Sequence, residues 1–127
     1  MKQDIFIENY WRYNMTKIQA IINSLEDINA FDIVVYDMRN ISPFFDYFVI
    51  SSANSDRQLH AAITHIGNDL AKENFEHPKF EGKDSKSWVL IDANDVIVNI
   101  FTKEEREYYN LEKMWAGIET VDIEKLK

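Results

Sequence analysis

Apolar residues recur along this chain of 127 residues in two rhythms, one typical of helices and the other typical of strands. From Met15 to Ile28 the apolar side chains lie three or four positions apart, which gathers them on one side of a helix. The same spacing returns from Ser55 to about Lys72. Ser55 and Gln58 open that stretch in the S-x-x-Q form of a capping box. The pattern therefore predicts two amphipathic helices.

Between and after these stretches, the apolar residues form short, nearly continuous runs that are rich in β-branched and aromatic side chains. Such runs are typical of strands that are covered on both faces. A polar break at residues 92–95 separates the last two runs, which predicts a β-hairpin. The predicted strands lie at residues 31–36, 47–52, 88–91 and 96–101, and a short edge strand is expected at 79–81.

The predicted elements place the chain in the α/β (mixed α+β) class. A last short helix is expected from Lys103, because Thr102-x-x-Glu105 repeats the capping-box pattern. The order predicts one domain with a mixed sheet of four or five strands flanked by helices. Residues 1–14 do not continue the first helical pattern, and we interpret them as an N-terminal extension.

Composition narrows the function mainly by exclusion. Hydrophobic residues make up 46% of the chain and aromatic residues 13%, as in a folded globular protein. The absence of cysteine excludes thiol catalysis, disulfides and cysteine zinc sites. No apolar run approaches the roughly 20 residues of a membrane-spanning helix. The first residues also lack the basic start and apolar core of a signal peptide. We expect a cytoplasmic protein without a membrane partner.

The formal charge of −8 bears on the choice of partner. An acidic protein repels the phosphate backbone, and its 14 Lys and Arg residues are scattered. We therefore expect no DNA binding and at most minor direct contact with RNA. A basic protein surface is the more natural partner, because complementary charge favours encounter.

Residues able to carry chemistry do not assemble into a known catalytic pattern. Asp92 and Asp95 flank the hairpin turn, where acids commonly satisfy turn backbone. The three histidines, at positions 60, 65 and 77, lack the spacing of a zinc motif. The sequence also lacks a G-x-S-x-G elbow and a glycine-rich phosphate loop. The sequence predicts a binding module with no catalytic residue, cofactor or metal site.

Three segments, taken in order, resemble the signatures of one family. Residues 46–58 (DYFVISSANSDRQ) resemble D-Y-F-V-I-[AC]-[ST]-G-x-S-x-R-Q, and residues 88–101 resemble W-V-L-x-D-x-G-D-V-x-V-H-x-F. The closing pattern R-x-F-Y-x-L-E-x-L-W is matched at Arg106, Tyr109, Leu111, Glu112 and Trp115, and Glu81-Gly82 matches an E-G before the second block. These signatures are those of the ribosomal silencing factor family, also called RsfS or Iojap-like. The resemblance covers residues 15–116 and leaves 117–127 as a C-terminal tail.

The resemblance implies a translational repressor without catalytic activity. Family members bind the large ribosomal subunit through ribosomal protein L-fourteen and sterically block its joining with the small subunit. The family fold is a mixed sheet of nucleotidyltransferase-like topology, and homodimers are known among its members. Two alternatives stay open: a nucleotidyltransferase-like enzyme, and a homodimeric assembly module that does not bind ribosomes.

Three departures from the family pattern bear on loop conformation and chemistry. Ala53 and Asn94 replace glycines, and Asn99 replaces a histidine. Asn tolerates the left-handed backbone that a turn glycine often adopts, so we expect Asn94 to preserve the hairpin turn. Asn99 cannot carry charge, so an acid or base is not needed there. Ala53 puts the usual conformation of its loop in question.

The predicted binding surface combines aromatic anchors with acids that would face a basic partner. Its predicted contact residues are Trp88, Leu90, Asp92, Asp95, Tyr109, Leu111, Glu112 and Trp115. A second set, expected to support the neighbouring loop and helix cap, comprises Asp46, Tyr47, Ser55 and Gln58. The alternative for the two tryptophans is that their rings fill the core of the domain itself.

Overall fold

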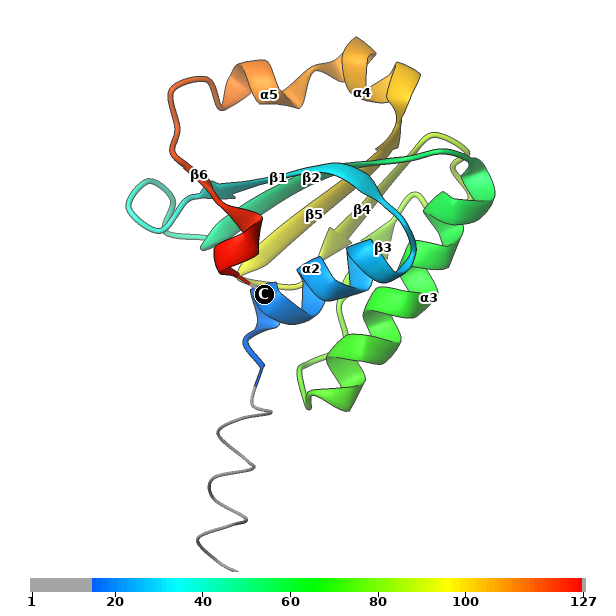
Figure 1. Ribbon diagram of the computed structural model, residues 1–127, viewed down its shortest axis with the longest axis horizontal. Helices are drawn as coiled ribbons and strands as arrows, with labels where there is room; N and C mark the ends of the chain where they lie inside the picture. The colour runs from blue at the N-terminus through cyan, green and yellow to red at the C-terminus, as the bar shows by residue number, and fades with distance from the viewer. Residues whose placement is uncertain (1–14, 127) are drawn as a thin grey trace, which may run out of the picture.

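The computed structural model describes residues 15–126 and forms one mixed sheet with helices on both faces (Figure 1). The strand order across the sheet is β3-β4-β5-β2-β1-β6. The mixed α/β class predicted from the sequence is confirmed, with six strands rather than four or five. The elements are α2 (Lys17–Asp27), β1 (Phe31–Asp37), β2 (Tyr47–Ala53), α3 (Asp56–Lys72), β3 (Lys79–Glu81), β4 (Trp88–Asp92), β5 (Val96–Thr102), α4 (Lys103–Tyr109), α5 (Leu111–Met114), β6 (Thr120–Val121) and a 3-10 turn, η1 (Ile123–Lys125).

The middle of the sheet is a parallel pair, β2 and β5, in which Val49 lies opposite Val98. All other neighbouring strands are antiparallel. The predicted hairpin is confirmed: β4 and β5 pair from Trp88 opposite Phe101 to Asp92 opposite Ile97. The central strands are buried on both faces, which explains their continuous apolar sequence.

The first sheet face is covered by α2 and α3, which lie below the sheet in Figure 1. We call it the α2–α3 face. Both helices begin with side-chain caps: Thr16 and Gln19 form a complete capping box, and the hydroxyl of Ser55 accepts from the backbone of Gln58. The core on this face is aliphatic and fully enclosed, and it includes Ile21, Ile22, Leu25, Leu59, Ile66, Leu70, Val89, Ile91, Val98 and Ile100.

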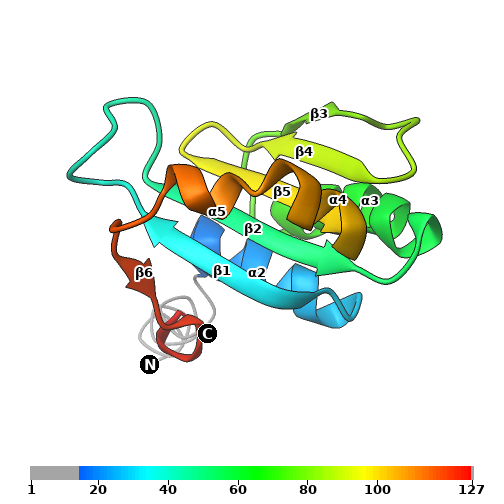
Figure 2. The same cartoon turned by 90° about the horizontal axis from the view of Figure 1, so that it is seen from above.

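The second sheet face is covered only in part. Seen from above in Figure 2, α4 and α5 cross over β5 and β2, while β4 and β3 extend beside them. We call it the α4–α5 face. The predicted capping box at Thr102 is wrong, because its side chain makes no capping bond within the described chain. The two helices are separated at Asn110, whose φ of 48° is left-handed.

The C-terminal residues return to the sheet instead of trailing from it. Thr120 and Val121 pair with Tyr36 and Val35 on the outer side of β1, and η1 follows. The predicted extension at residues 1–14 lies outside the described residues. None of the helices between residues 15 and 126 is both long and apolar enough to cross a membrane.

Candidate partner-binding face

An aromatic stack forms where the β4–β5 hairpin meets α4. The Trp88 ring lies 4.9 Å from the ring of Phe101 and 4.7 Å from that of Tyr109, measured between centroids. Tyr108 meets Tyr109 edge-on at 5.1 Å and is itself largely exposed. The indole N–H of Trp88 donates to Oδ1 of Asn99 over 3.0 Å. Local packing therefore fixes the orientation of Trp88, while one edge of the stack faces solvent.

Asn99 occupies the position of the family histidine. It is 1% exposed and lies under the aromatic stack, where it accepts the Trp88 bond. A neutral amide fulfils that acceptor role without a charge. This agrees with the expectation that the position needs neither an acid nor a base.

Trp115 and Leu111 pack at the other end of this layer. The Trp115 ring meets Phe48 edge-on at 5.1 Å, and both residues join the cluster below α5. The indole N–H of Trp115 is buried and finds no hydrogen-bond partner among residues 15–126. The rings of Trp88 and Trp115 both pack on the domain itself, so each has a core role in addition to any role in binding.

Arg106 fastens the two short helices to the sheet. Its guanidinium donates to Glu112 at 2.8 Å, to the backbone carbonyl of Asp32 at 2.7 Å and to the hydroxyl of Ser52 at 2.8 Å. The Arg106 side chain is mostly buried, so the three bonds lie in a poorly solvated environment. Burial, and then the charge of Glu112, raise the pKa of the nearby Tyr36 phenol. Because Glu112 accepts the hydrogen bond from Arg106, its carboxylate already has an ionic partner within the protein.

The uncovered half of this face lies over β4. Leu90 and Trp88 border a shallow hollow of about 220 Å³ with Glu81 and Gly82. Gly82 has a φ of +83°, and a Cβ there would stand 2.5 Å from the carbonyl oxygen of Trp88. Only glycine lets the chain before β4 pass this close, so Gly82 shapes the hollow.

Several large apolar side chains are exposed, and sequence reasoning had not selected most of them. Only one of the set, Tyr109, was predicted. One sequence signal could have identified such residues: an apolar residue outside the helical and strand patterns, such as Phe44 after Pro43, has no predicted core position. The exposed fractions are 83% for Phe44, 78% for Tyr108, 63% for Met114, 55% for Ile41 and 45% for Tyr109.

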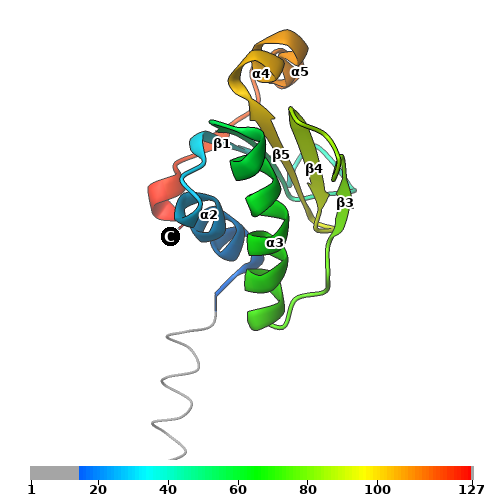
Figure 3. The ribbon, with the colours of Figure 1, turned by 90° about the vertical axis from the view of Figure 1, so that its right-hand side faces the viewer.

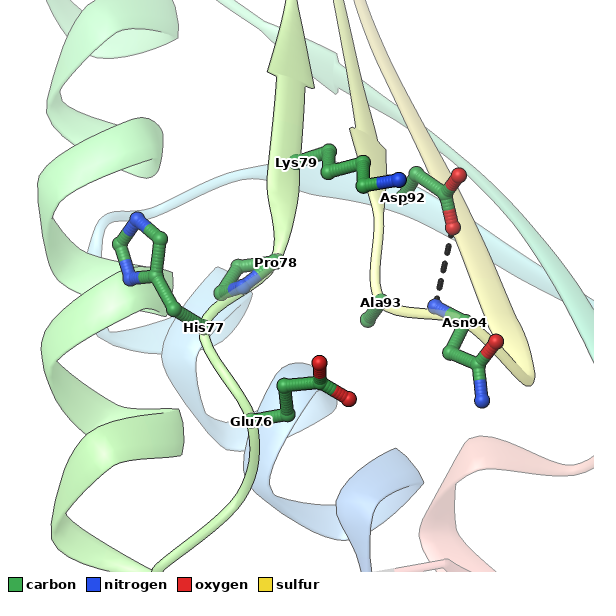
Figure 4. A pocket seen from close by; sticks show the side chains of 7 residues that line it. All are labelled: Glu76, His77, Pro78, Lys79, Asp92, Ala93 and Asn94. Atoms are coloured by element: carbon green, nitrogen blue, oxygen red, sulfur yellow. Dashed lines mark hydrogen bonds between the residues drawn. The ribbon is translucent and has the colours of Figure 1, made fainter.

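The hairpin acids have separate structural partners at the far end of β4 and β5. Figure 4 shows Asp92 accepting from the backbone N–H of Asn94, at 2.9 Å. Asn94 has a φ of 74°, so it preserves the turn in place of glycine. Asp95 pairs with the ammonium of Lys17 at 2.6 Å, on α2. The two carboxylates thus support the turn and α2, and neither adjoins the aromatic stack.

A small pocket opens beside this turn. Its volume is about 130 Å³, and in Figure 4 the side chains of Glu76, Lys79 and Asp92 border it from two strands and a loop. His77 points away from the pocket toward α3, where its ring meets Phe80. Acidic and basic groups therefore alternate around the opening, and they do not converge on one ligand position.

The predicted support residues lie at opposite ends of β2. Gln58 holds the start of α3: its side-chain amide accepts from the backbone of Asn54 and donates to the carbonyls of Ile28 and Asn29 at 2.7 and 3.0 Å. Its amide therefore ties α3 to the end of α2. The Ser55 half of the predicted capping box is present, but the side chain of Gln58 accepts from the backbone N–H of Asn54 instead of that of Ser55.

At the other end of β2, the backbone N–H of Asp46 donates to the carbonyl of Asp95. The guanidinium of Arg39 lies 5.5 Å from the Tyr47 ring.

Ala53, which replaces the family glycine, is the last residue of β2; it pairs with Thr102 and has no positive φ. An alanine is therefore accommodated there without strain.

Comparison with known proteins gives consistent matches in sequence and in structure. The sequence model described as ribosomal silencing factor during starvation matches residues 13–127. The ribosomal silencing factor RsfS of Halalkalibacterium halodurans is 37% identical over 87% of this chain and 95% of its own. The Bacillus subtilis protein of that name is 41% identical over 78% and 84%.

A crystal structure of a Chromobacterium violaceum protein superposes with a TM-score of 0.74 at 30% identity, covering 80% of this chain and 84% of that one. A Bacillus halodurans structure gives 0.72 at 37% identity, covering 83% and 95%. The match extends to both ends of the described fold, including β6. On these matches and on the shared fold, the chain belongs to the ribosomal silencing factor family.

Proposed function

We propose that this protein represses translation by binding the large ribosomal subunit through ribosomal protein L-fourteen and blocking its joining with the small subunit. Family membership supports a role in regulating translation at the ribosome, and we place that role in the cytoplasm. The observation that carries the proposed site is the half-covered α4–α5 face. Exposed rings there adjoin a fixed Trp88 and a shallow hollow, which is the anatomy of a binding surface.

Within the predicted contact set, the geometry favours an inner group over the hairpin acids. Trp88, Leu90 and Tyr109 lie together at the open edge of the stack. Leu111, Glu112 and Trp115 form the adjoining helical border, with Glu112 held by Arg106. We assign Asp92 and Asp95 a peripheral electrostatic role, since each already serves a turn or an ion pair. In this proposal the face binds its partner by surface complementarity and blocks subunit joining sterically, which requires no catalytic group.

The deciding experiment is cosedimentation of the purified protein with large subunits, followed by a subunit-joining assay. Leu90→Glu places a charge in the apolar hollow, and we expect at least a tenfold loss of binding together with loss of the block. Ala61→Glu is the matched control, because Ala61 is exposed on α3 below the opposite sheet face. Equal binding by wild type and Leu90→Glu, with the fold intact, would remove the proposed site.

A homodimer built on the same surface is the second candidate function, since exposed aromatic faces also serve self-association. Sedimentation at several protein concentrations, with and without large subunits, separates the two. A dimer that dissociates on large subunits indicates one shared surface. A stable dimer that ignores ribosomes would replace the repressor proposal.

The alternative function, a nucleotidyltransferase-like enzyme, is less well supported by the arrangement of these residues. Such chemistry requires acids that converge on a metal ion, together with a phosphate-gripping turn. Asp92 and Asp95 point to different partners, and Ala53 stands at the glycine position of the family turn. We therefore propose a non-enzymatic protein.

A further inference from the structure

On the other side of the sheet, one imidazole stands between two carboxylates from different helices. Nε2 of His65 lies 3.4 Å from Oδ2 of Asp27 and 3.4 Å from Oδ2 of Asp69. His65 and Asp69 belong to α3, and Asp27 is the last residue of α2. In Figure 3 these helices lie next to each other, away from α4 and α5. The three ligand atoms all fall within 4.8 Å of one another.

The two separations that involve Nε2 of His65 match those between ligands of one metal ion. Residues four apart on a helix project from the same side, so His65 and Asp69 approach a common point. Four ligands placed tetrahedrally around zinc at about 2.0–2.1 Å are separated from each other by about 3.3–3.4 Å. The two separations at Nε2 have this length; they are longer than a typical direct N–H···O bond, and the one to Asp27 is still within hydrogen-bond distance.

The surroundings of the cluster suit a cation. Asp27 and Asp69 line a groove of about 370 Å³ between the two helices together with Asn23, Lys72 and Glu73, whereas His65 is not part of its lining. The groove is open enough for water to complete the coordination. The ammonium of Lys72 lies 4.0 Å from the other oxygen of Asp69 and is well exposed. It can therefore turn away without disturbing the core.

We propose that Asp27, His65 and Asp69 bind Zn²⁺, with water as the fourth ligand, and that the ion links the end of α2 to α3. An imidazole nitrogen with two carboxylates favours zinc over Mg²⁺ or Ca²⁺, which prefer all-oxygen sites. The site lies on the α2–α3 side and shares no residue with the proposed ribosome-binding face. The two proposals are therefore independent of each other.

The competing explanation is a purely ionic clip, in which protonated His65 pairs with both acids and no metal is involved. The metal site and the ionic clip predict different effects of added metal on the protein. A metal site gains stability and a spectroscopic signal from the ion, whereas an ionic clip gains neither. Selectivity among the chain's three histidines then separates a built site from adventitious binding.

The test uses the full-length, chelator-treated protein with Zn²⁺ and, as a spectroscopic probe, Co²⁺. We expect one equivalent of Co²⁺ to give visible absorption bands of tetrahedral type that Zn²⁺ abolishes. Free Zn²⁺ at about a hundred times its Kd should raise the Tm by roughly 5–10 °C. Asp27→Asn and His65→Gln should each lose the bands and the shift in Tm.

His60→Gln is the matched control on the same helix, since His60 contacts the carbonyl of Ser85 instead of an acid. It should bind Co²⁺ like wild type. Asp27→Asn tests the proposal without threatening the fold, because Asp27 is exposed at the end of its helix. The proposal fails if wild type gives no tetrahedral bands, or if His60→Gln loses as much metal binding as His65→Gln.

Discussion

The two faces of the sheet are built from different chemistry. The α2–α3 face encloses aliphatic side chains, nearly all of them inaccessible to solvent, under two helices with side-chain caps. The α4–α5 face carries Tyr36, Phe48 and Phe101 under two short helices in which no residue is fully buried. Arg106 supplies much of the attachment of those helices through polar bonds.

Under the proposed function, this difference separates stability from recognition within one small domain. Closed aliphatic packing gives most stability per residue, because apolar area is removed completely from water. The aromatic layer leaves part of its area exposed, and a partner can complete its burial. The first face therefore contributes most of the stability, and the second is the face that we propose binds a partner.

The largest expected effect is on the closed face. Leu70→Ala removes a side chain with no solvent exposure, and we expect the free energy of unfolding to fall by about 3 kcal/mol. Urea denaturation measures it. Leu111→Ala is the matched change on the other face, where the leucine is only partly buried, and should cost about 1 kcal/mol. Equal losses would contradict the contrast between the faces.

A smaller effect is expected at the polar attachment of α4 and α5. Arg106→Lys keeps the charge but cannot reach Glu112, Ser52 and the carbonyl of Asp32 together, so we expect a loss of about 1–2 kcal/mol. Amide hydrogen exchange should quicken in α4 and α5 before it does in α2 and α3. Arg57→Lys, at an exposed position of α3, serves as the control. Uniform quickening in all four helices would argue against a local attachment.

The smallest effect concerns alkaline pH. Burial, with the charge of Glu112, raises the pKa of Tyr36 above its ordinary value of 10.0. The folded protein therefore holds this proton where the unfolded chain releases it. The stability that this contributes is complete below pH 10 and declines as pH rises through the folded-state pKa. Tyr36→Phe should lack this decline.

Near-ultraviolet titration of phenolate in the wild type, with the Tyr36→Phe curve subtracted, isolates the Tyr36 ionisation. Its midpoint should lie above 10.0. A midpoint at or below that value would mean that the α4–α5 layer admits water to the phenol. The aromatic layer would then be more open than its packing indicates.

Sequence reasoning succeeded where the cause of structure is local. The hairpin followed from two β-branched runs and the turn chemistry of Asp92 and Asn94, and both are readable within a few residues. The cap at Ser55 followed from its own hydroxyl and Gln58, although Gln58 also bonds the end of α2.

Features that depend on residues distant in the sequence were not predicted from it. β6 has two residues, and only the free edge of β1 makes it a strand. The expected cap at Thr102 failed because a matching motif does not fix the hydroxyl's direction. His65 was compared only with the other histidines, and its acid partners come from its own helix four residues on and from α2. The exposure of Phe44 likewise depends on where its loop ends.

The parallel pairing of β2 with β5 has a consequence for how the chain folds. Val49 can pair with Val98 only after α3, β3 and β4 have been synthesised, so the pairing at the centre of the sheet spans well over a third of the sequence. Contacts of such long range slow folding, because the loop must be ordered before the pairing stabilises it. During synthesis, the centre of the sheet cannot form until β5 has left the exit tunnel. Until then β2 lacks its neighbour β5, and the nascent chain exposes the edge of a strand that is almost fully buried in the finished fold.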